Sequence, residues 1–310
     1  MLFVLLYCVL CDKNELTQSM SQEAVNDFAI TNKGVISSIK NYVKNLVENV
    51  QVPAAKAKNP YSSSIYSTEA KLTTDDITER TDSNNIITGT CGDNVNFSLN
   101  KDTEELEIYG SGNMTDYIAY KSPFYNSKIK NYFNSVVIKE GVTSIGNNIF
   151  YFCKKLTSAS IPISVTSIGT SAFSCIEMLT SINIPNSVKT IGANAFYWCS
   201  RLTSVKLPNN ITSIADYAFY KCFALSSIMI PESVTSIGKS AFEESGLTSI
   251  FIHKSVNSIG LCAFGKCTKL EAINVSGENQ AYKSKEGVLF NYNITELIVC
   301  PSGKKGRYSI

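Results

Sequence analysis

The segment Val165–Pro185, VTSIGTSAFSCIEMLTSINIP, is the part of the chain that decides the fold. It contains LTSINI (Leu179–Ile184), in which the first, fourth and sixth residues are apolar. This LxxLxL spacing is typical of a short strand that buries one edge. A second short apolar segment, VTSI (Val165–Ile168), precedes it, and Ala172 and Phe173 lie between the two. The segment therefore predicts two short strands joined by a bend that carries a large apolar side chain.

The same unit recurs every 23 residues, which identifies a repeat protein. Its copies align on six isoleucines, and the fifth copy is one residue shorter than the others: Ile145, Ile168, Ile191, Ile214, Ile237 and Ile259. A phenylalanine follows each of these index isoleucines by five residues and is preceded by alanine in five copies: Phe150, Phe173, Phe196, Phe219, Phe242 and Phe264. In a chain with only 15 phenylalanines this regularity does not arise by chance.

Most copies also have a proline or a glycine where their strands end. A proline closes the LxxLxL strand in four copies, since proline cannot donate a hydrogen bond to the next strand: Pro162, Pro185, Pro208 and Pro231. A glycine follows the index isoleucine in five copies and permits a bend: Gly146, Gly169, Gly192, Gly238 and Gly260. Ala215 takes this place in the remaining copy, so the bend cannot require a positive φ there.

One copy cannot bury its own apolar edge, but copies stacked at a strand spacing of about 4.8 Å form a continuous core. We therefore predict a repeat solenoid over residues 141–275. It is a β-rich, right-handed leucine-rich-repeat stack of 23-residue units with short helical turns. The six phenylalanines are expected to fill the space between the two strands of each unit.

The segments before the repeat differ from it. Residues 1–11 contain an apolar run about half as long as the roughly 20 residues of a spanning helix, and they predict a secretory signal peptide. A buried strand or a misplaced start codon are the alternatives. Residues 12–58 predict a helical N-terminal segment, with the helix over 19–52, because apolar residues recur there at spacings of three and four. Residues 59–88 are rich in Ser, Thr, Asp and Asn and predict a flexible linker.

The two ends of the repeat are also irregular. Residues 89–140 predict a β cap on the first unit, with alternating strands at Val95–Leu99 and Leu106–Ile108. Residues 276–310 predict an irregular C-terminal unit. Its hairpin strands are expected at Gly287–Phe290 and Leu297–Val299. Because a solenoid needs a polar closing unit, we expect this last copy to be incomplete.

Charge and hydropathy exclude two classes of partner. The chain has 28 Lys and Arg against 26 Asp and Glu, which gives a net charge of +2. This charge produces no field that gathers phosphates, and no basic cluster is interleaved with aromatic residues, so we expect no nucleic-acid partner. We also expect no membrane span, because the longest apolar run is too short.

Catalytic chemistry has few candidate residues. His253 is the only histidine, so Ser–His or Cys–His catalysis and imidazole metal sites would all depend on it. It has no acidic neighbour at a short spacing. The glycines form no phosphate-binding loop. We therefore predict no enzyme activity, no catalytic residue, no metal and no cofactor.

The cysteines follow the repeat. Four of the ten fall eight residues after the index isoleucine and a fifth falls one place earlier: Cys153, Cys199, Cys222, Cys267 and, earlier, Cys175. A small, mildly apolar residue suits an inward site, so we predict a column of buried free thiols. Cys199 and Cys222 lie on neighbouring units at a separation that a disulfide could bridge, which leaves oxidation as an alternative. The absence of a CxxC pair disfavours zinc.

Four stretches outside the repeats are also distinctive: GTCGDNVNFSL at Gly89–Leu99, GSGNMTDY at Gly110–Tyr117, SPFY at Ser122–Tyr125 and YKSKEGVLFN at Tyr282–Asn291. Together with the repeat, they resemble the BspA-like leucine-rich-repeat proteins over residues 89–310. The resemblance implies a secreted or surface-exposed protein that attaches to host cells, matrix proteins or other microbes. Fold alone does not determine such an activity.

One strand position changes from copy to copy while its neighbours repeat. It is the fifth place of LxxLxL, which points away from the core. We call these residues the variable column: Ser160, Asn183, Lys206, Met229, Phe251 and Asn274. A uniform scaffold with one changing column is how a solenoid presents a recognition surface. Ser/Thr pairs beside the column are interpreted first as a solvated strand face, with ligand contact as the alternative.

These patterns lead to two functional hypotheses. The first is a non-enzymatic adhesion or recognition protein, secreted or at the cell surface, whose variable column binds a protein or glycan of a host cell or matrix. Met229 and Phe251, about 5 Å apart on neighbouring strands, would form an exposed apolar spot flanked by Lys206 and Asn274. The second is a cytoplasmic interaction scaffold. Neither hypothesis predicts an oligomeric state.

Overall fold

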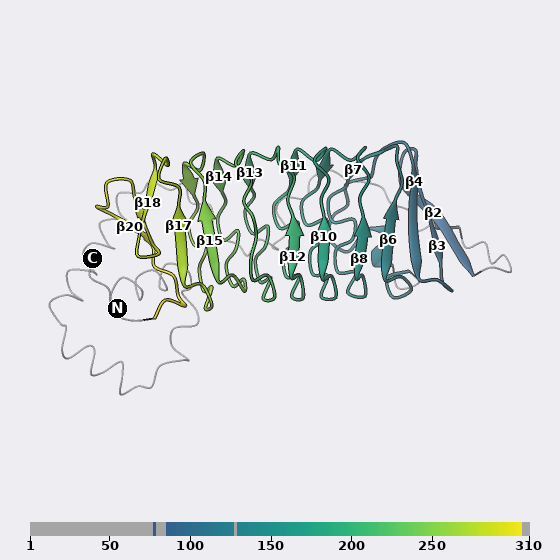
Figure 1. Cartoon of the computed structure of the whole chain (residues 1–310). Helices are drawn as coiled ribbons and strands as arrows, with labels where there is room; N and C mark the ends of the chain where they lie inside the picture. The colour runs from purple at the N-terminus through teal and green to yellow at the C-terminus, as the bar shows by residue number, and fades with distance from the viewer. Residues whose placement is uncertain (1–76, 79–84, 127–128, 306–310) are drawn as a thin grey trace, which may run out of the picture. The chain divides into compact units, whose positions relative to one another are not determined.

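A computed structural model describes residues 77–78, 85–126 and 129–305 (Figure 1). The strands are β1 (Ile77–Thr78), β2 (Ile86–Gly92), β3 (Val95–Asn100), β4 (Glu105–Gly110), β5 (Gly112–Asn113), β6 (Ser135–Ile138), β7 (Val142–Ile145), β8 (Ser158–Ser160), β9 (Ser167–Ile168), β10 (Ser181–Asn183), β11 (Thr190–Ile191), β12 (Ser204–Lys206), β13 (Ser213–Ile214), β14 (Ser236–Ile237), β15 (Ser249–Ile252), β16 (Ser258–Ile259), β17 (Ala272–Val275), β18 (Tyr282–Lys285), β19 (Val288–Asn291) and β20 (Leu297–Val299). A single 3-10 turn, η2 (Pro123–Tyr125), is present in the described residues. Within the same residues, no helix has the length and apolar character needed to cross a bilayer.

The predicted signal peptide (1–11) and helical segment (12–58) lie outside the described residues. Most of the predicted linker (59–88) also lies outside the described residues, and its described part contains β1 and the start of β2 at Ile86. Ile87 is buried in the core. Few residues of β2 face inward, so the polar composition of this stretch gives no sign of a strand.

The first sheet joins antiparallel strands to the parallel stack, in the order β1-β2-β3-β4-β6-β8. Val95, Phe97 and Leu99 of β3 are buried, and β4 buries Leu106 and Ile108 against them. The alternation predicted for these two segments is confirmed. Because β4 pairs in parallel with β6, the antiparallel strands lie beside the first strands of the stack.

The repeats form two rows of short parallel strands. The first row contains the LxxLxL strands β8, β10, β12, β15 and β17, which follow one another in chain order in Figure 1, with one rung that has no strand between β12 and β15. The second row contains the index-isoleucine strands β7, β9, β11, β13, β14 and β16. Paired strands join equivalent positions of neighbouring copies, as in Ser181 with Ser204 and Ile237 with Ile259. Each copy is therefore one rung of a β-solenoid, as the period predicts.

A column of stacked phenylalanines occupies the core between the two rows. From Phe150 to Phe264, the ring centroids of neighbouring rungs are 5.3 to 5.7 Å apart. All six rings are almost fully buried, which confirms the predicted packing. Phe124 in η2 extends the column at its first end, 5.4 Å from Phe150. That residue precedes the first repeat, so the period does not identify it.

The bend between the rows is not helical, so the prediction of short helical turns is wrong. In each rung the third and seventh residues after the index isoleucine have positive φ: Asn148, Ser171, Asn194, Tyr217, Ser240 and Cys262, then Phe152, Cys175, Trp198, Lys221, Glu244 and Lys266. An α-helix needs right-handed residues whose amides donate four residues back along the chain. Here alternate amides donate to the next rung instead: Ser171 N to Ala193 O (2.9 Å), Phe173 N to Ala195 O (2.9 Å) and Cys175 N to Tyr197 O (2.7 Å). The bends thus form a third ladder along the stack.

The repeated glycines are required by a close approach of backbones. None of the five has a positive φ, as the alanine in the remaining copy predicts. A Cβ on Gly192 would lie 2.5 Å from Thr170 N, too close for any side chain. Gly192 N donates to Ile168 O at 2.8 Å, but in the described structure Ala215 makes no equivalent bond. The second row also divides there, because β11 does not pair with β13.

The last described residues form an antiparallel sheet of β18, β19 and β20. The pairing of β19 with β20 confirms the predicted hairpin strands. β18 was not predicted, because its sequence YKSK has no apolar alternation. Glu286 and Gly287 both have positive φ between β18 and β19, as a two-residue hairpin turn requires.

Candidate partner-binding face

All six residues of the variable column are exposed, and they lie on successive rungs. Asn183 of β10 is in register with Lys206 of β12, and Phe251 of β15 is in register with Asn274 of β17. Equivalent positions of paired strands share one face of a sheet. The stacking of the first row therefore brings each of these pairs together on the outer side of the strands.

The apolar part of the column is open to solvent. Met229 is 83% exposed and Phe251 is 47% exposed. The Phe251 ring makes an edge-to-face contact with the ring of His253, with the centroids 5.0 Å apart. His253 also has a structural backbone role, because its carbonyl accepts a hydrogen bond from Asn279 Nδ2 at 2.7 Å. The His253 ring thus covers one part of Phe251, and the remainder of the Phe251 side chain is exposed.

Met229 lies on the one rung whose LxxLxL segment forms no strand in the described residues. The strand pairing of the first row is interrupted there, with β10 and β12 on one side and β15 and β17 on the other, as it also is between β8 and β10. Leu225 and Ile230 of this rung are still buried, so its apolar edge holds it in the stack. The rung therefore keeps its buried apolar residues although its LxxLxL segment forms no paired strand.

Lys206 is the single charged residue of the variable column. It is exposed and forms no ion pair within the described part of the chain. Other lysines have carboxylate partners on the neighbouring rung, as in Lys154 with Glu177 at 2.6 Å. The variable column contains no acidic residue that could neutralise Lys206.

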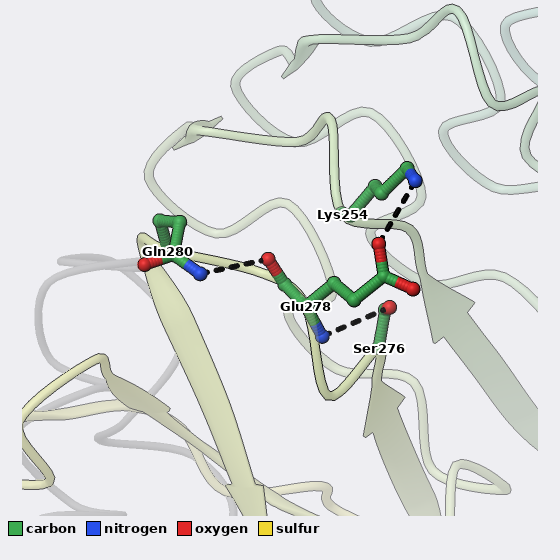
Figure 2. Close-up of polar contacts among 4 residues, drawn as sticks. All are labelled: Lys254, Ser276, Glu278 and Gln280. Carbon is green, nitrogen blue, oxygen red and sulfur yellow. Dashed lines mark hydrogen bonds and ion pairs between the residues drawn. The ribbon is translucent and has the colours of Figure 1, made fainter.

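The loop beyond β17 illustrates such neutralisation (Figure 2). Lys254 Nζ contacts a Glu278 carboxylate oxygen at 2.9 Å, and this hydrogen bond and charge lower the pKa of Glu278 and raise the pKa of Lys254. Glu278 N donates to Ser276 Oγ (3.3 Å), and Gln280 Nε2 donates to Glu278 O (3.0 Å). The loop charges are therefore satisfied internally, in contrast to Lys206.

The Ser/Thr pairs beside the column have a structural role in part. Thr157 Oγ1 donates to Asn134 O and Thr203 Oγ1 donates to Thr180 O, both at 2.9 Å. Each threonine thus ties its strand to the preceding rung. The adjacent serines form a row of small, exposed side chains on successive rungs: Ser158, Ser181, Ser204, Ser227 and Ser249.

The predicted column of buried free thiols is confirmed. Cys153, Cys175, Cys199, Cys222 and Cys267 are all free and buried, so the alternative of a Cys199–Cys222 disulfide is not observed. Three of the thiols bond to the carbonyl of a column phenylalanine on the preceding rung: Cys199 to Phe173 O (3.1 Å), Cys222 to Phe196 O (3.2 Å) and Cys267 to Phe242 O (3.0 Å). Burial raises their pKa values, that of Cys222 to about 12, which suppresses the nucleophilic thiolate. Within the described residues, no three His, Cys, Asp or Glu side chains gather in a metal-binding arrangement.

Sequence reasoning missed a second surface, the aromatic cluster on the bends. Tyr197 and Tyr220 stack at 5.0 Å, and Lys221 Nζ lies 4.9 Å from the ring centroid of Trp198. Tyr220 OH donates to Glu244 Oε1 at 3.1 Å, and burial together with this acid raises the pKa of Tyr220. Lys221 is also 3.9 Å from Glu244. The aromatic residues recur six and seven places after the index isoleucine, which was the signal available. Because the rings and charges of this cluster contact one another across neighbouring rungs, we interpret it as a structural contact that holds the rungs together.

Comparison with known proteins identifies the repeat. The family profile described as the BspA type leucine rich repeat region matches six copies over residues 118–222 and 189–308, together more than half of the chain. Among curated proteins, no sequence matches the chain.

Solved structures provide further similar chains. A leucine rich cell surface protein from Faecalibacterium prausnitzii A2-165 is 30% identical, with a TM-score of 0.57 over 69% of this chain and 62% of its own. A leucine-rich repeat protein from Eubacterium ventriosum is 29% identical, with a TM-score of 0.47 over 71% of this chain and 52% of its own. The chain therefore spans only about half to three fifths of the length of these proteins.

Proposed function

Because the chain belongs to the BspA-type leucine-rich repeat family, we propose that it is a non-enzymatic recognition protein whose variable column binds a protein or glycan outside the cell. In a solenoid the stack supplies a uniform scaffold, and the changing positions supply the chemistry of recognition. The family fold is typically a binding scaffold. The threonines beside the column bond to the preceding rung and the thiols are buried, so neither group is available to a partner as the exposed variable column is.

The observation that carries this proposal is the exposure of Met229 and Phe251 on neighbouring rungs. A protein normally buries large apolar side chains or scatters them singly over its surface. Here two of them occupy equivalent positions of neighbouring rungs, next to a row of exposed serines, and Lys206 takes the same position on the preceding rung. An aromatic anchor surrounded by polar residues is typical of the centre of a binding interface.

A binding experiment tests the face directly. The full chain is applied to an array of matrix proteins and cell-surface glycans, and Phe251→Ala is compared with the native chain on every ligand that binds. We expect the substitution to weaken binding by about 1–3 kcal/mol and to leave the thermal stability unchanged. Phe223→Ala is the matched control, because Phe223 is 45% exposed but lies on a bend outside the column.

The proposal is overturned if binding persists unchanged in a variant that combines Lys206→Ala, Met229→Ala and Phe251→Ala. The partner would then contact another face or the first 88 residues.

An extracellular location is the second part of the proposal. It is supported by the F. prausnitzii relative, which is described as a cell surface protein, and by the apolar segment predicted as a signal peptide. Cell fractionation and N-terminal sequencing are expected to find a mature chain at the surface or in the medium, without residues 1–11. A cytosolic chain that still begins at Met1 would favour the scaffold hypothesis instead.

A further inference from the structure

The charge at Lys206 and the apolar pair beside it form one composite surface. Lys206 is one rung before Met229, and Met229 is one rung before Phe251. We call these three residues the composite patch. The patch displays one positive charge at one end and two large apolar side chains at the other, with no acid in the column between them.

Lys206 of the composite patch has no acidic partner in the described residues, unlike several lysines elsewhere in the stack. Some lysines on the bends and loops meet a carboxylate on the next rung, as Lys154 meets Glu177 and Lys254 meets Glu278. In the described residues, no such partner approaches Lys206. A carboxylate brought by a partner would make a charge-assisted hydrogen bond there. Binding would desolvate both groups, so the pair would contribute more to selectivity than to affinity.

The apolar end of the patch favours a side chain over a sugar. Met229 has no hydrogen-bonding group for sugar hydroxyls, and its flexible thioether adapts to irregular apolar shapes. Phe251 is the one aromatic residue of the patch on which a sugar could stack, and its ring is already in edge-to-face contact with the His253 ring. At the Met229 rung the first row has no paired strand, and Thr248 of the next rung bonds to this segment at Ser226 O (3.1 Å), three residues before Met229.

We propose that the partner is a protein segment that packs an apolar side chain between Met229 and Phe251 and directs a nearby carboxylate to Lys206. This inference rests on the proposed function of the variable column, and it names the chemistry of the partner.

Selection from a library of random linear peptides displayed on phage tests the inference. The full native chain is the target. We expect the enriched peptides to combine an aromatic or aliphatic residue with Asp or Glu a few positions away. Selection on Lys206→Glu is expected to replace the acidic residue by Lys or Arg and to retain the apolar one. Lys189→Glu is the matched control, because Lys189 is exposed on the loop before β11, outside the column.

Affinity measurements on one selected acidic peptide sharpen the test. We expect Lys206→Glu to weaken its binding about tenfold or more and Lys189→Glu to leave it unchanged. Met229→Ser is expected to weaken it without altering its dependence on salt. Circular dichroism of each variant checks that the exposed substitutions preserve the fold.

Three outcomes overturn the inference: peptides enriched without any acid, the same acidic peptides selected by Lys206→Glu, or enrichment that is insensitive to Met229→Ser. A fourth outcome is a glycan that binds the native chain but not Phe251→Ala on the array. It would retain the variable column as the binding face and reject a protein partner. Failure of the proposed function itself is distinguishable, because array binding would then survive the triple substitution.

Discussion

A phenylalanine of the core column is held between two other rings, so its truncation removes contacts on both sides. Phe196 is fully buried and lies 5.6 Å from Phe173 and 5.4 Å from Phe219, centroid to centroid. We expect Phe196→Ala to lower the free energy of unfolding by about 3–5 kcal/mol, because neighbouring rungs cannot close the cavity without breaking their ladders. Urea denaturation measures the change.

Phe223→Ala provides the comparison, with an expected change within about 0.5 kcal/mol, because the Phe223 side chain is already exposed. Equal losses in the two variants would show that the column does not hold the stack together.

The buried thiols make stability depend on pH in the alkaline range. Burial raises the pKa of Cys222 to about 12, whereas a thiol in the unfolded chain ionises near about 8.5. Between these values the unfolded state loses a proton that the folded state retains, so a rise in pH lowers the free energy of unfolding. The slope approaches about 1.4 kcal/mol per pH unit for each such thiol. The stabilising effect is complete below the unfolded pKa.

We therefore expect Cys222→Ala to show a shallower loss of stability between about pH 9 and pH 11 than the native chain. Urea denaturation at a series of pH values, with a reductant present, measures both slopes. Parallel curves would mean that the Cys222 thiol is not the group that titrates on unfolding.

At the scale of single residues, periodicity explains what the sequence could predict. The phenylalanine and cysteine columns were predictable because a side chain that faces the core must recur with the rung. The left-handed residues were not, because Ser171, Trp198 and Glu244 share no property that favours positive φ. Their conformation follows from the ladder that their amides make with the next rung. In the candidate binding face, the exposure of Met229 was predictable, but the absence of an ion-pair partner for Lys206 in the described residues required the structure.

At the scale of the element, the strands are too short to be stable alone and depend on the contact between rungs. Gly192 shows how close this contact is. A Cβ at this residue would lie 2.5 Å from Thr170 N and 2.7 Å from Gly169 C. We expect Gly192→Ala to lower the free energy of unfolding by about 1–3 kcal/mol, as other overpacked sites do.

Gly277→Ala is the control for this prediction. A Cβ on Gly277 meets nothing within 4 Å, and its φ is not positive. We expect this variant to be unchanged or stabilised by up to about 1 kcal/mol, because alanine reduces the entropy of the unfolded chain. Thermal unfolding of both variants decides whether the loss of stability in Gly192→Ala comes from the close backbone contact or from the replacement of a glycine in general.

The strands and their rows follow from the pattern of apolar residues, but their interruptions do not. The LxxLxL motif at Leu225–Ile230 satisfies the pattern as well as the motif at Leu202–Leu207 does. Only the latter includes a strand. The pattern records which side chains face the core, whereas strand pairing depends on the distance between neighbouring backbones. The short helical turns failed as a prediction for the same reason, because cross-rung bonds are invisible in one rung's sequence.

At the scale of the whole stack, stability is a sum over rungs and the interfaces between them, so one weak interface can divide the solenoid. The interface between the rungs of Ile191 and Ile214 is such a place. The second-row ladder is broken there, but the phenylalanine column continues across it. The core thus connects two blocks whose backbones are less tightly joined than elsewhere.

The methyl group of Ala215 is the physical cause that we assign to this break, and Ala215→Gly tests it. At equivalent places Gly192 N and Gly238 N donate to the preceding rung at 2.8 Å, and Lys189 N and Thr235 N do likewise. In the described structure, Thr212 and Ala215 lack these bonds, so we expect their amides to exchange with deuterium faster than those four. Glycine at position 215 would let the rungs close, and both amides should then exchange as slowly as their equivalents.

The free energy of unfolding is expected to change little in Ala215→Gly, because the entropy cost of glycine, about 0.4–1 kcal/mol, offsets the new hydrogen bonds. Hydrogen exchange followed residue by residue is therefore the decisive measurement, and Ala193→Gly on the preceding bend is the matched control. Fast exchange at Thr212 that persists in Ala215→Gly would mean that the break arises elsewhere in the rung. The discontinuous first row around Met229 would then be the candidate cause, and the weak interface would extend to the proposed binding face.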